Sequence, residues 1–256
     1  MENNRTPSCV VTASAGNFAQ GLLYCTRKLG IPCIVVVPDH APETKLAAMA
    51  RLDPNVTIIK VPFAAWWDTL MTGRHASTPA DATFISPVTN RDVMAGNGTI
   101  GLEIMDQCGD VDAVIIPYGG GALAVGVASA VKHINPKVKC YAVESDQAAP
   151  LAASFKAGKP TEFAYQPSFI DGMGGKSVVP ELVLSFLALL HVITHKLTIY
   201  FGEKVADGVD VAGRLTRRQC RGGCCGTGVH DAEELCRRRH AKYVHTPVFV
   251  VCMERR

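Results

Sequence analysis

The sequence predicts an α/β fold in which helices cover both faces of parallel β-sheets. From Ser14 onward, short apolar runs alternate with amphipathic helical segments along the chain. The apolar runs, such as "CIVVV" and "AVII", are continuous, which is typical of strands that are buried on both faces of a sheet. With 256 residues, 48% of them hydrophobic and 19% charged, the chain is long enough for one or two domains with a real core.

The expected elements follow one another without an internal repeat or a low-complexity linker. The segment "NFAQGLLYCTRKL" at 17–29 has helical periodicity and ends before Gly30, a residue suited to the left-handed end of a helix. A strand at 32–38 and a helix at 41–52 come next. Further strands are expected at 56–61, 82–88, 112–118 and 138–144, and further helices at 63–77, 98–108 and 122–134.

After about Gly213 the composition changes. Residues 214–256 hold nine Arg and one Lys against four acidic residues, a net charge of +6, and five of the ten cysteines, before a strand-like run at 247–252. The Arg clusters lack interleaved aromatic residues, so we expect no nucleic-acid partner. Because many Cys and His residues are scattered here, we interpret the tail as compositionally biased and expect no metal. The side chains that approach the spacing of a structural zinc site are Cys220, Cys224, Cys236 and His240.

The first residues of the chain and its cysteines indicate in which cellular compartment the protein is expected. The first thirty residues lack the charged, apolar and small-residue order of a signal peptide, and the chain is too long for a small disulfide scaffold. The longest apolar run, at 182–194, is shorter than the roughly 18 residues that suggest a membrane span. We therefore expect a cytoplasmic protein with reduced cysteines and no membrane segment.

The segment "VIIPYGGGALAVG" is the strongest local signal for a binding site. An apolar strand leads into Gly119, Gly120 and Gly121, and a helix begins at once. Backbone N–H groups in such a turn can close on an anion while the helix directs its positive end to the same point, so the segment predicts a phosphate site. Two alternatives remain open: a tight turn without a ligand, and a dinucleotide fingerprint that uses Gly119, Gly121 and Ala124 with Glu144.

Three segments in the same order resemble the motifs of one family. "TASAGNFAQG" at 12–21 is similar to A-S-A-G-N-H-A-Q-G, "AGNGTIGLEI" at 95–104 to G-Q-G-T-I-G-L-E-I, and "PYGGGAL" at 117–123 to P-V-G-G-G-G-L. The family is the pyridoxal-phosphate-dependent serine/threonine dehydratases of fold type II, which includes serine racemase. The resemblance covers 14–144 and continues more loosely through "IDGMGGKS" at 170–177 to about residue 208.

This resemblance implies a fold of two open parallel-sheet, three-layer α/β/α domains with the cofactor cleft between them. A small domain at 10–90 would carry the Ser-Ala-Gly-Asn motif, and an incomplete large domain at 91–256 would carry the phosphate loop and, from about 214, the divergent tail. The implied activity is the conversion of a serine- or threonine-type amino acid to a 2-oxo acid and ammonia, in a homodimer with pyridoxal 5′-phosphate. The implied cofactor-binding residues are Asn17, at the ring, and Gly119, Gly120, Gly121, Ala122 and Leu123, at the phosphate; Ser14, Ala15 and Gly16 would bind the substrate.

Particular positions refine what the resemblance implies. Racemases of the group have a second serine where this chain has Ala15, which favours elimination over racemisation. In the racemases and some dehydratases a divalent ion is held after the strand that ends in a glutamate. Here Glu144 and Ala148 match that site, but Pro150 stands where an acid is expected, so again we expect no metal.

The family also attaches its cofactor as a Schiff base to a lysine upstream of the asparagine motif. In this chain the first lysine is Lys28, inside the helix, and Lys176 in "GGKS" is interpreted as a loop charge. The catalytic lysine is therefore expected to be absent, together with the beginning of a usual family member, so that activity is impaired. Two other functions remain open: a non-catalytic cofactor-binding product of an altered gene, and a dinucleotide-binding domain of an oxidoreductase.

Overall fold

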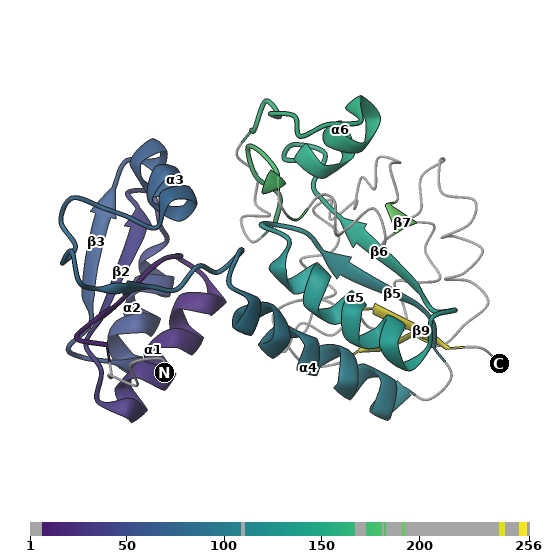
Figure 1. Cartoon of the computed structure of the whole chain (residues 1–256), viewed down its shortest axis with the longest axis horizontal. Coiled ribbons are helices and arrows are strands. Elements are labelled where there is room, and N and C mark those ends of the chain that lie inside the picture. Colours follow the sequence, from purple (N-terminus) through teal and green to yellow (C-terminus); the bar gives the residue numbers. More distant parts are fainter. Residues whose placement is uncertain are drawn as a thin grey trace, which may run out of the picture. The chain divides into compact units, whose positions relative to one another are not determined.

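The structure, a computed structural model, describes residues 7–108, 111–166, 173–180 and 182, and the backbone of three further strands at 191–192, 241–243 and 251–254. The chain divides into two compact units, Met1–Asn90 and Arg91–Arg256. Each unit combines helices with a β-sheet, as Figure 1 shows. The α/β fold class predicted from the sequence is confirmed.

The first unit contains a four-stranded parallel sheet in the order β3-β2-β1-β4. Its strands are β1 (Val10–Ala13), β2 (Cys33–Pro38), β3 (Thr57–Val61) and β4 (Thr83–Phe84), and its helices are α1 (Asn17–Leu29), α2 (Glu43–Leu52) and α3 (Phe63–Thr72). Because all the strands are parallel, the loops that follow them leave the same edge of the sheet. Helix α1 ends at Gly30, whose φ of 66° is left-handed, as expected.

Alternation along β2 explains the layers of this unit. Cys33, Val35 and Val37 pack with α1 and α2 in one buried cluster that includes Leu23. Successive side chains of a strand point to opposite faces, so Val36, which is also fully buried, faces the other way. Helix α3 packs against β1 and β2, and its buried residues lie in its last turns.

The second unit contains a five-stranded sheet in the order β7-β6-β5-β9-β8. Its strands are β5 (Val111–Pro117), β6 (Lys139–Val143), β7 (His191–Val192), β8 (Ala241–Tyr243) and β9 (Val251–Glu254), and its helices are α4 (Arg91–Cys108), α5 (Ala122–Ile134) and α6 (Pro150–Ala157). Strands β5, β6 and β7 are parallel, but β9 runs antiparallel to β5 and β8 antiparallel to β9. The expected sheet was parallel throughout; the two antiparallel strands come from the tail, where apolar periodicity is sparse.

Helices α4 and α5 lie side by side in this unit (Figure 1), and glycines allow their close approach. A Cβ atom at Gly126 on α5 would collide with the carbonyl oxygen of Met94, and one at Gly101 on α4 would lie 2.8 Å from the carbonyl oxygen of Val127. Both glycines are therefore needed where the two backbones touch. This contact gives the segment "AGNGTIGLEI" a structural role.

Most expected elements form close to their predicted bounds, but several differ. The helix expected at 63–77 ends at Thr72, and the strand expected at 82–88 is limited to Thr83–Phe84. Strand β1 and helix α6 were not predicted, because β1 has four residues and α6 has eight, too few for a clear period. Helix α4 begins at Arg91, seven residues before the predicted start. No helix in the described part of the chain is long and apolar enough to cross a membrane. The zinc-like pattern of the tail lies outside the described residues.

Candidate functional site

The Ser-Ala-Gly-Asn motif occupies the turn between β1 and α1. The Ser14 hydroxyl accepts a hydrogen bond from the N–H of Gly16, 3.3 Å away, which closes the turn locally. Gly16 is the N-cap of α1, with an extended φ of −111°, and a Cβ atom added there would have no neighbour within 4 Å. Neither the backbone nor the packing of the chain requires glycine here, and the space beside its Cα atom is open to a ligand.

Asn17 is the first residue of α1 and its side chain is exposed. Asn17 does not cap α1, because Gly16 holds the N-cap position and no side-chain hydrogen bond caps the helix. The amide of Asn17 therefore has no capping role that would explain it. Its exposure at the carboxyl edge of the sheet is compatible with binding a ligand.

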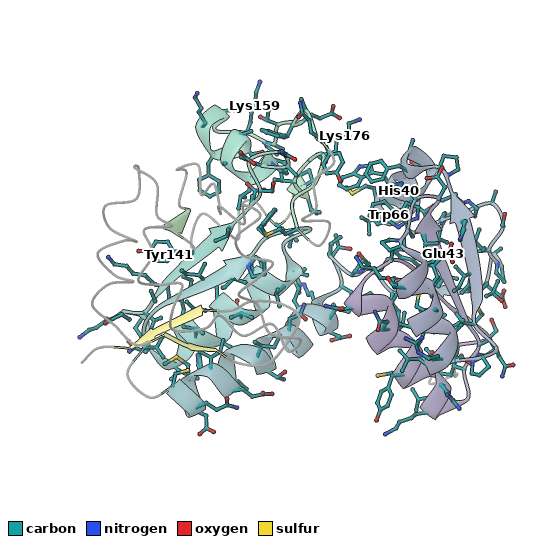
Figure 2. The ribbon with its side chains drawn as sticks, turned by 180° about the vertical axis from the view of Figure 1, so that it is seen from behind. His40, Glu43, Trp66, Tyr141, Lys159 and Lys176 are labelled. Carbon is teal, nitrogen blue, oxygen red and sulfur yellow. The ribbon has the colours of Figure 1, made fainter. Side chains whose placement is uncertain are left out.

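Aromatic side chains gather at the same sheet edge of this unit. Phe63 begins α3 just after β3, and its ring centroid lies 5.5 Å from that of Trp66 and 6.3 Å from that of Trp67. His40 follows β2, and its ring lies 5.8 Å from that of Phe63; Figure 2 labels His40 and Trp66 in this cluster. The sequence pattern alone favours a packing role for the tryptophans, and their half-buried ring contacts agree with it.

The glycine loop of the second unit joins β5 to α5. Gly121 is the N-cap of α5 and has a φ of 101°, a left-handed conformation that only glycine adopts without strain. The first i→i−4 bond of the helix runs from Val125 to the carbonyl oxygen of Gly121, 2.9 Å away, so the preceding N–H groups have no partner within the helix. The first turn carries no acidic residue. These residues fit a phosphate ester, which would receive N–H donors and the positive end of the helix dipole.

Glu144 lies directly after β6. Its carboxylate oxygens accept hydrogen bonds from the N–H groups of Leu151 and Ala152, each at 2.9 Å. Burial raises the pKa of Glu144 to about 7, against the opposing effect of those two backbone donors. A carboxylate engaged with α6 is poorly suited to a ribose hydroxyl, so the structure does not support the dinucleotide alternative.

Tyr118 lies directly before the glycine loop and is fully buried. Burial, with a smaller effect of the neighbouring Glu144 charge, raises the pKa of the Tyr118 hydroxyl. The residue is therefore neutral over the ordinary pH range. Sequence reasoning included Tyr118 only as a letter of the motif "PYGGGAL"; its burial comes from the tertiary fold.

The position compared with a divalent-ion site does not fit a cation. Glu144 is engaged with α6, and Pro150, the first residue of α6, has no side-chain oxygen. Among the described residues no group of three His, Cys, Asp or Glu side chains could hold a metal ion.

Several lysines of the described part have surface contacts. Lys28 lies over the ring of Tyr24, at 4.6 Å from its centroid, and Lys60 pairs with Glu43 at 2.7 Å. The Lys176 side chain is exposed, and Figure 2 shows it in the same unit as Lys159. These placements agree with charges on the surface.

The chain is similar to known proteins over most of its length. A family model described as pyridoxal-phosphate dependent enzyme matches residues 2–250. The L-threonine ammonia-lyase of Thermotoga maritima is 35% identical over 203 residues, which are 78% of this chain and 48% of that protein. The catabolic L-threonine dehydratase TdcB of Escherichia coli strain K12 is 40% identical over 163 residues, 64% of this chain and 49% of that protein.

The chain is also similar to solved structures. The processed form of threonine deaminase isoform 2 from Solanum lycopersicum superposes with a TM-score of 0.62 and 29% identity, and covers 74% of this chain and 57% of that one. The resemblance inferred from the three motifs is confirmed. The chain spans about half the length of the two curated relatives named above.

Proposed function

Because the chain belongs to the family of pyridoxal-phosphate dependent enzymes, we propose that it is a dehydratase. In this proposal it acts as an ammonia-lyase on β-hydroxy amino acids of the serine and threonine type and gives a 2-oxo acid and ammonia. The main support for this proposal is the geometry of the glycine loop at the start of α5. There the left-handed Gly121 precedes N–H groups that have no partner within the helix. The names of the similar proteins support this reaction type.

The roles of the chain's own residues follow from their chemistry. Gly119 to Leu123 would bind the phosphate through backbone N–H groups, and Asn17 would donate its amide to the oxygen on the cofactor ring. Ser14 to Gly16 would bind the substrate carboxylate, for which Gly16 leaves open space. When bound, pyridoxal phosphate supplies an electron sink for the charge that develops at the substrate's α-carbon.

Ala15 lies in the Ser-Ala-Gly-Asn turn between β1 and α1. Its methyl group can neither donate nor accept a proton, so the Ser-Ala-Gly-Asn turn supplies no acid or base from this position. We therefore propose elimination of the β-hydroxyl and not racemisation.

A second candidate is a protein that binds the cofactor without turnover. The described contacts of Lys28 and Lys60 are with Tyr24 and Glu43 on the surface, and neither amine is assigned to the cofactor. Without an amine to attach the cofactor and remove the α-proton, turnover would be lost while the phosphate contacts remained.

One experiment separates the two candidates. Equilibrium dialysis measures the affinity of the full chain for pyridoxal phosphate, and an ammonia assay measures turnover of L-serine and L-threonine. Binding with ammonia release supports the dehydratase, and binding without it supports the second candidate. A chain that binds no pyridoxal phosphate would contradict both.

A pair of glycine variants tests the phosphate site itself. Gly121→Ala strains a left-handed residue at the loop and displaces the N–H donors, so we expect the affinity for pyridoxal phosphate to fall by about tenfold or more, or ~1.4 kcal/mol. Gly158→Ala strains a residue with a φ of 67° at the C-terminal end of α6, away from the glycine loop in the sequence. The added Cβ atom would have no neighbour within 4 Å. This control should keep the wild-type affinity.

We also propose a homodimer that functions in a reducing, cytosolic compartment. The five cysteines of the described part, Cys9, Cys25, Cys33, Cys108 and Cys140, are free thiols, which agrees with such a compartment. Sedimentation equilibrium of the full chain tests the dimer, and a monomer at micromolar concentration would contradict it.

A further inference from the structure

The residue that leads into the glycine loop is held by two later segments of the chain. The N–H of Tyr118 donates to the carbonyl oxygen of Val143, 2.8 Å away, at the end of β6. The carbonyl oxygen of Tyr118 accepts a hydrogen bond from the N–H of Gly174, 2.7 Å away. The exit of β5 is thus fixed on both sides just before Gly119.

The first of these segments continues into a capped helix. Glu144 follows Val143 directly, and its two carboxylate oxygens accept the N–H groups of Leu151 and Ala152. The N-cap residue of α6, Ala149, has no side chain that could do this. Glu144 therefore ties the start of α6 to the end of β6.

The second segment packs on the turn between β6 and α6. Within that turn the N–H of Ala148 donates to the carbonyl oxygen of Ser145, 3.0 Å away. Gly174 has a φ of 79°, and a Cβ atom there would collide with the carbonyl oxygen and the Cβ atom of Ala148. Only glycine allows this segment to approach the turn closely enough to reach Tyr118.

These contacts form a closed ring. It runs from Tyr118 through β6 and Glu144 to α6, through the turn to Ala148, and through Gly174 back to Tyr118. We propose that Glu144 and Gly174 are positioning residues that hold the glycine loop in the geometry that binds phosphate. The inference rests on the proposed function for its ligand, but the ring itself can be tested without a ligand.

The ligand-free test is hydrogen exchange of the Tyr118 amide in the full chain, with Gly174→Ala, Glu144→Ala and Glu144→Gln. Loss of the ring should speed this exchange by about tenfold or more in Gly174→Ala and Glu144→Ala, since the amide then opens locally. Glu144→Gln keeps one acceptor oxygen and should lie between Glu144→Ala and the wild type. Gly158→Ala and the exposed Glu103→Gln are matched controls that should exchange at the wild-type rate.

The second arm measures the affinity for pyridoxal phosphate and the ³¹P signal of the bound ligand. We expect the affinity of Gly174→Ala and Glu144→Ala to fall by about tenfold, and the signal to broaden as the loop becomes mobile. A wild type that binds no pyridoxal phosphate would refute the proposed function, and hydrogen exchange would then decide the inference alone. Wild-type exchange at Tyr118 in both Gly174→Ala and Glu144→Ala would overturn the inference. Should Gly174→Ala not fold, the two Glu144 variants decide.

Discussion

Glu144 is a carboxyl group under two opposing influences. Burial favours its neutral form, while the N–H groups of Leu151 and Ala152 favour the carboxylate, and burial has the larger effect because the pKa is raised to about 7. The ordinary value for the unfolded chain is 4.5. The folded state therefore binds a proton more tightly at this residue than the unfolded state does.

This difference predicts a pH dependence of stability. A raised folded pKa contributes stability that is fully present below about 4.5 and is lost as the pH rises through about 7. Between pH ~5 and ~8 the free energy of unfolding should fall by on the order of 3 kcal/mol more in the wild type than in Glu144→Gln. Urea titrations across this range, followed by far-UV circular dichroism, measure the difference. Parallel pH curves for the two proteins would refute the assignment, and Glu103→Gln is the control.

At the scale of elements, α4 packs closely against α5, the helix that follows the glycine loop. Gly126 lies in the second turn of α5 and touches the backbone of α4 at Met94, so the two helices are packed without an intervening side chain. The segment that resembles a family motif thus supports the helix whose N-terminus would bind phosphate. Packing against α5 explains Gly98 and Gly101 of this segment, whereas Gly96 has no neighbour within 4 Å of an added Cβ atom.

Two alanine variants test this contact. Gly126→Ala should lower the free energy of unfolding by about 1–3 kcal/mol, because its methyl group collides with the Met94 carbonyl. Gly96→Ala, on the exposed side of α4 with no neighbour within 4 Å of the added Cβ, should raise it by about 0.5–1 kcal/mol by reducing the entropy of the unfolded chain. Urea denaturation measures both values. Equal effects of the two substitutions would contradict the close approach of the helices.

At the scale of the whole molecule, the chain divides into two units, and both tryptophans belong to the first of them. Trp66 and Trp67 are the chain's two tryptophans, and both belong to α3 in the first unit. Their fluorescence reports on the unfolding of that unit, whereas far-UV circular dichroism reports on both units. The chain therefore carries its own probe for one half of the molecule.

We predict that the two signals give different unfolding midpoints in urea. Gly126→Ala should shift the transition seen by circular dichroism and leave the fluorescence transition in place, because the substitution lies in the second unit. Coincident transitions that move together in the variant would show instead that the units unfold as one cooperative body.

The candidate site was only partly readable from the sequence. Gly119 to Gly121 are predicted as a binding loop because consecutive glycines between an apolar strand and a helix have few other uses, and Asn17 is predicted through the resemblance. Gly174 and the capping role of Glu144 were not found, because their contacts join segments that are far apart in the sequence. Strand β1 was missed because its four residues show no period, although the sheet places it at the centre of the first unit.

Local patterns were enough to predict the fold class, the order of most elements and the family, because hydrophobic period, glycine clusters and short motifs are properties of neighbouring residues. Three features follow only from the folded chain: Gly16 caps α1, Glu144 accepts N–H groups from α6, and Gly174 must lack a side chain. Each of these depends on which backbone atoms meet in space. These contacts are determined by the packing of strands and helices onto one another, and no stretch of neighbouring residues encodes them.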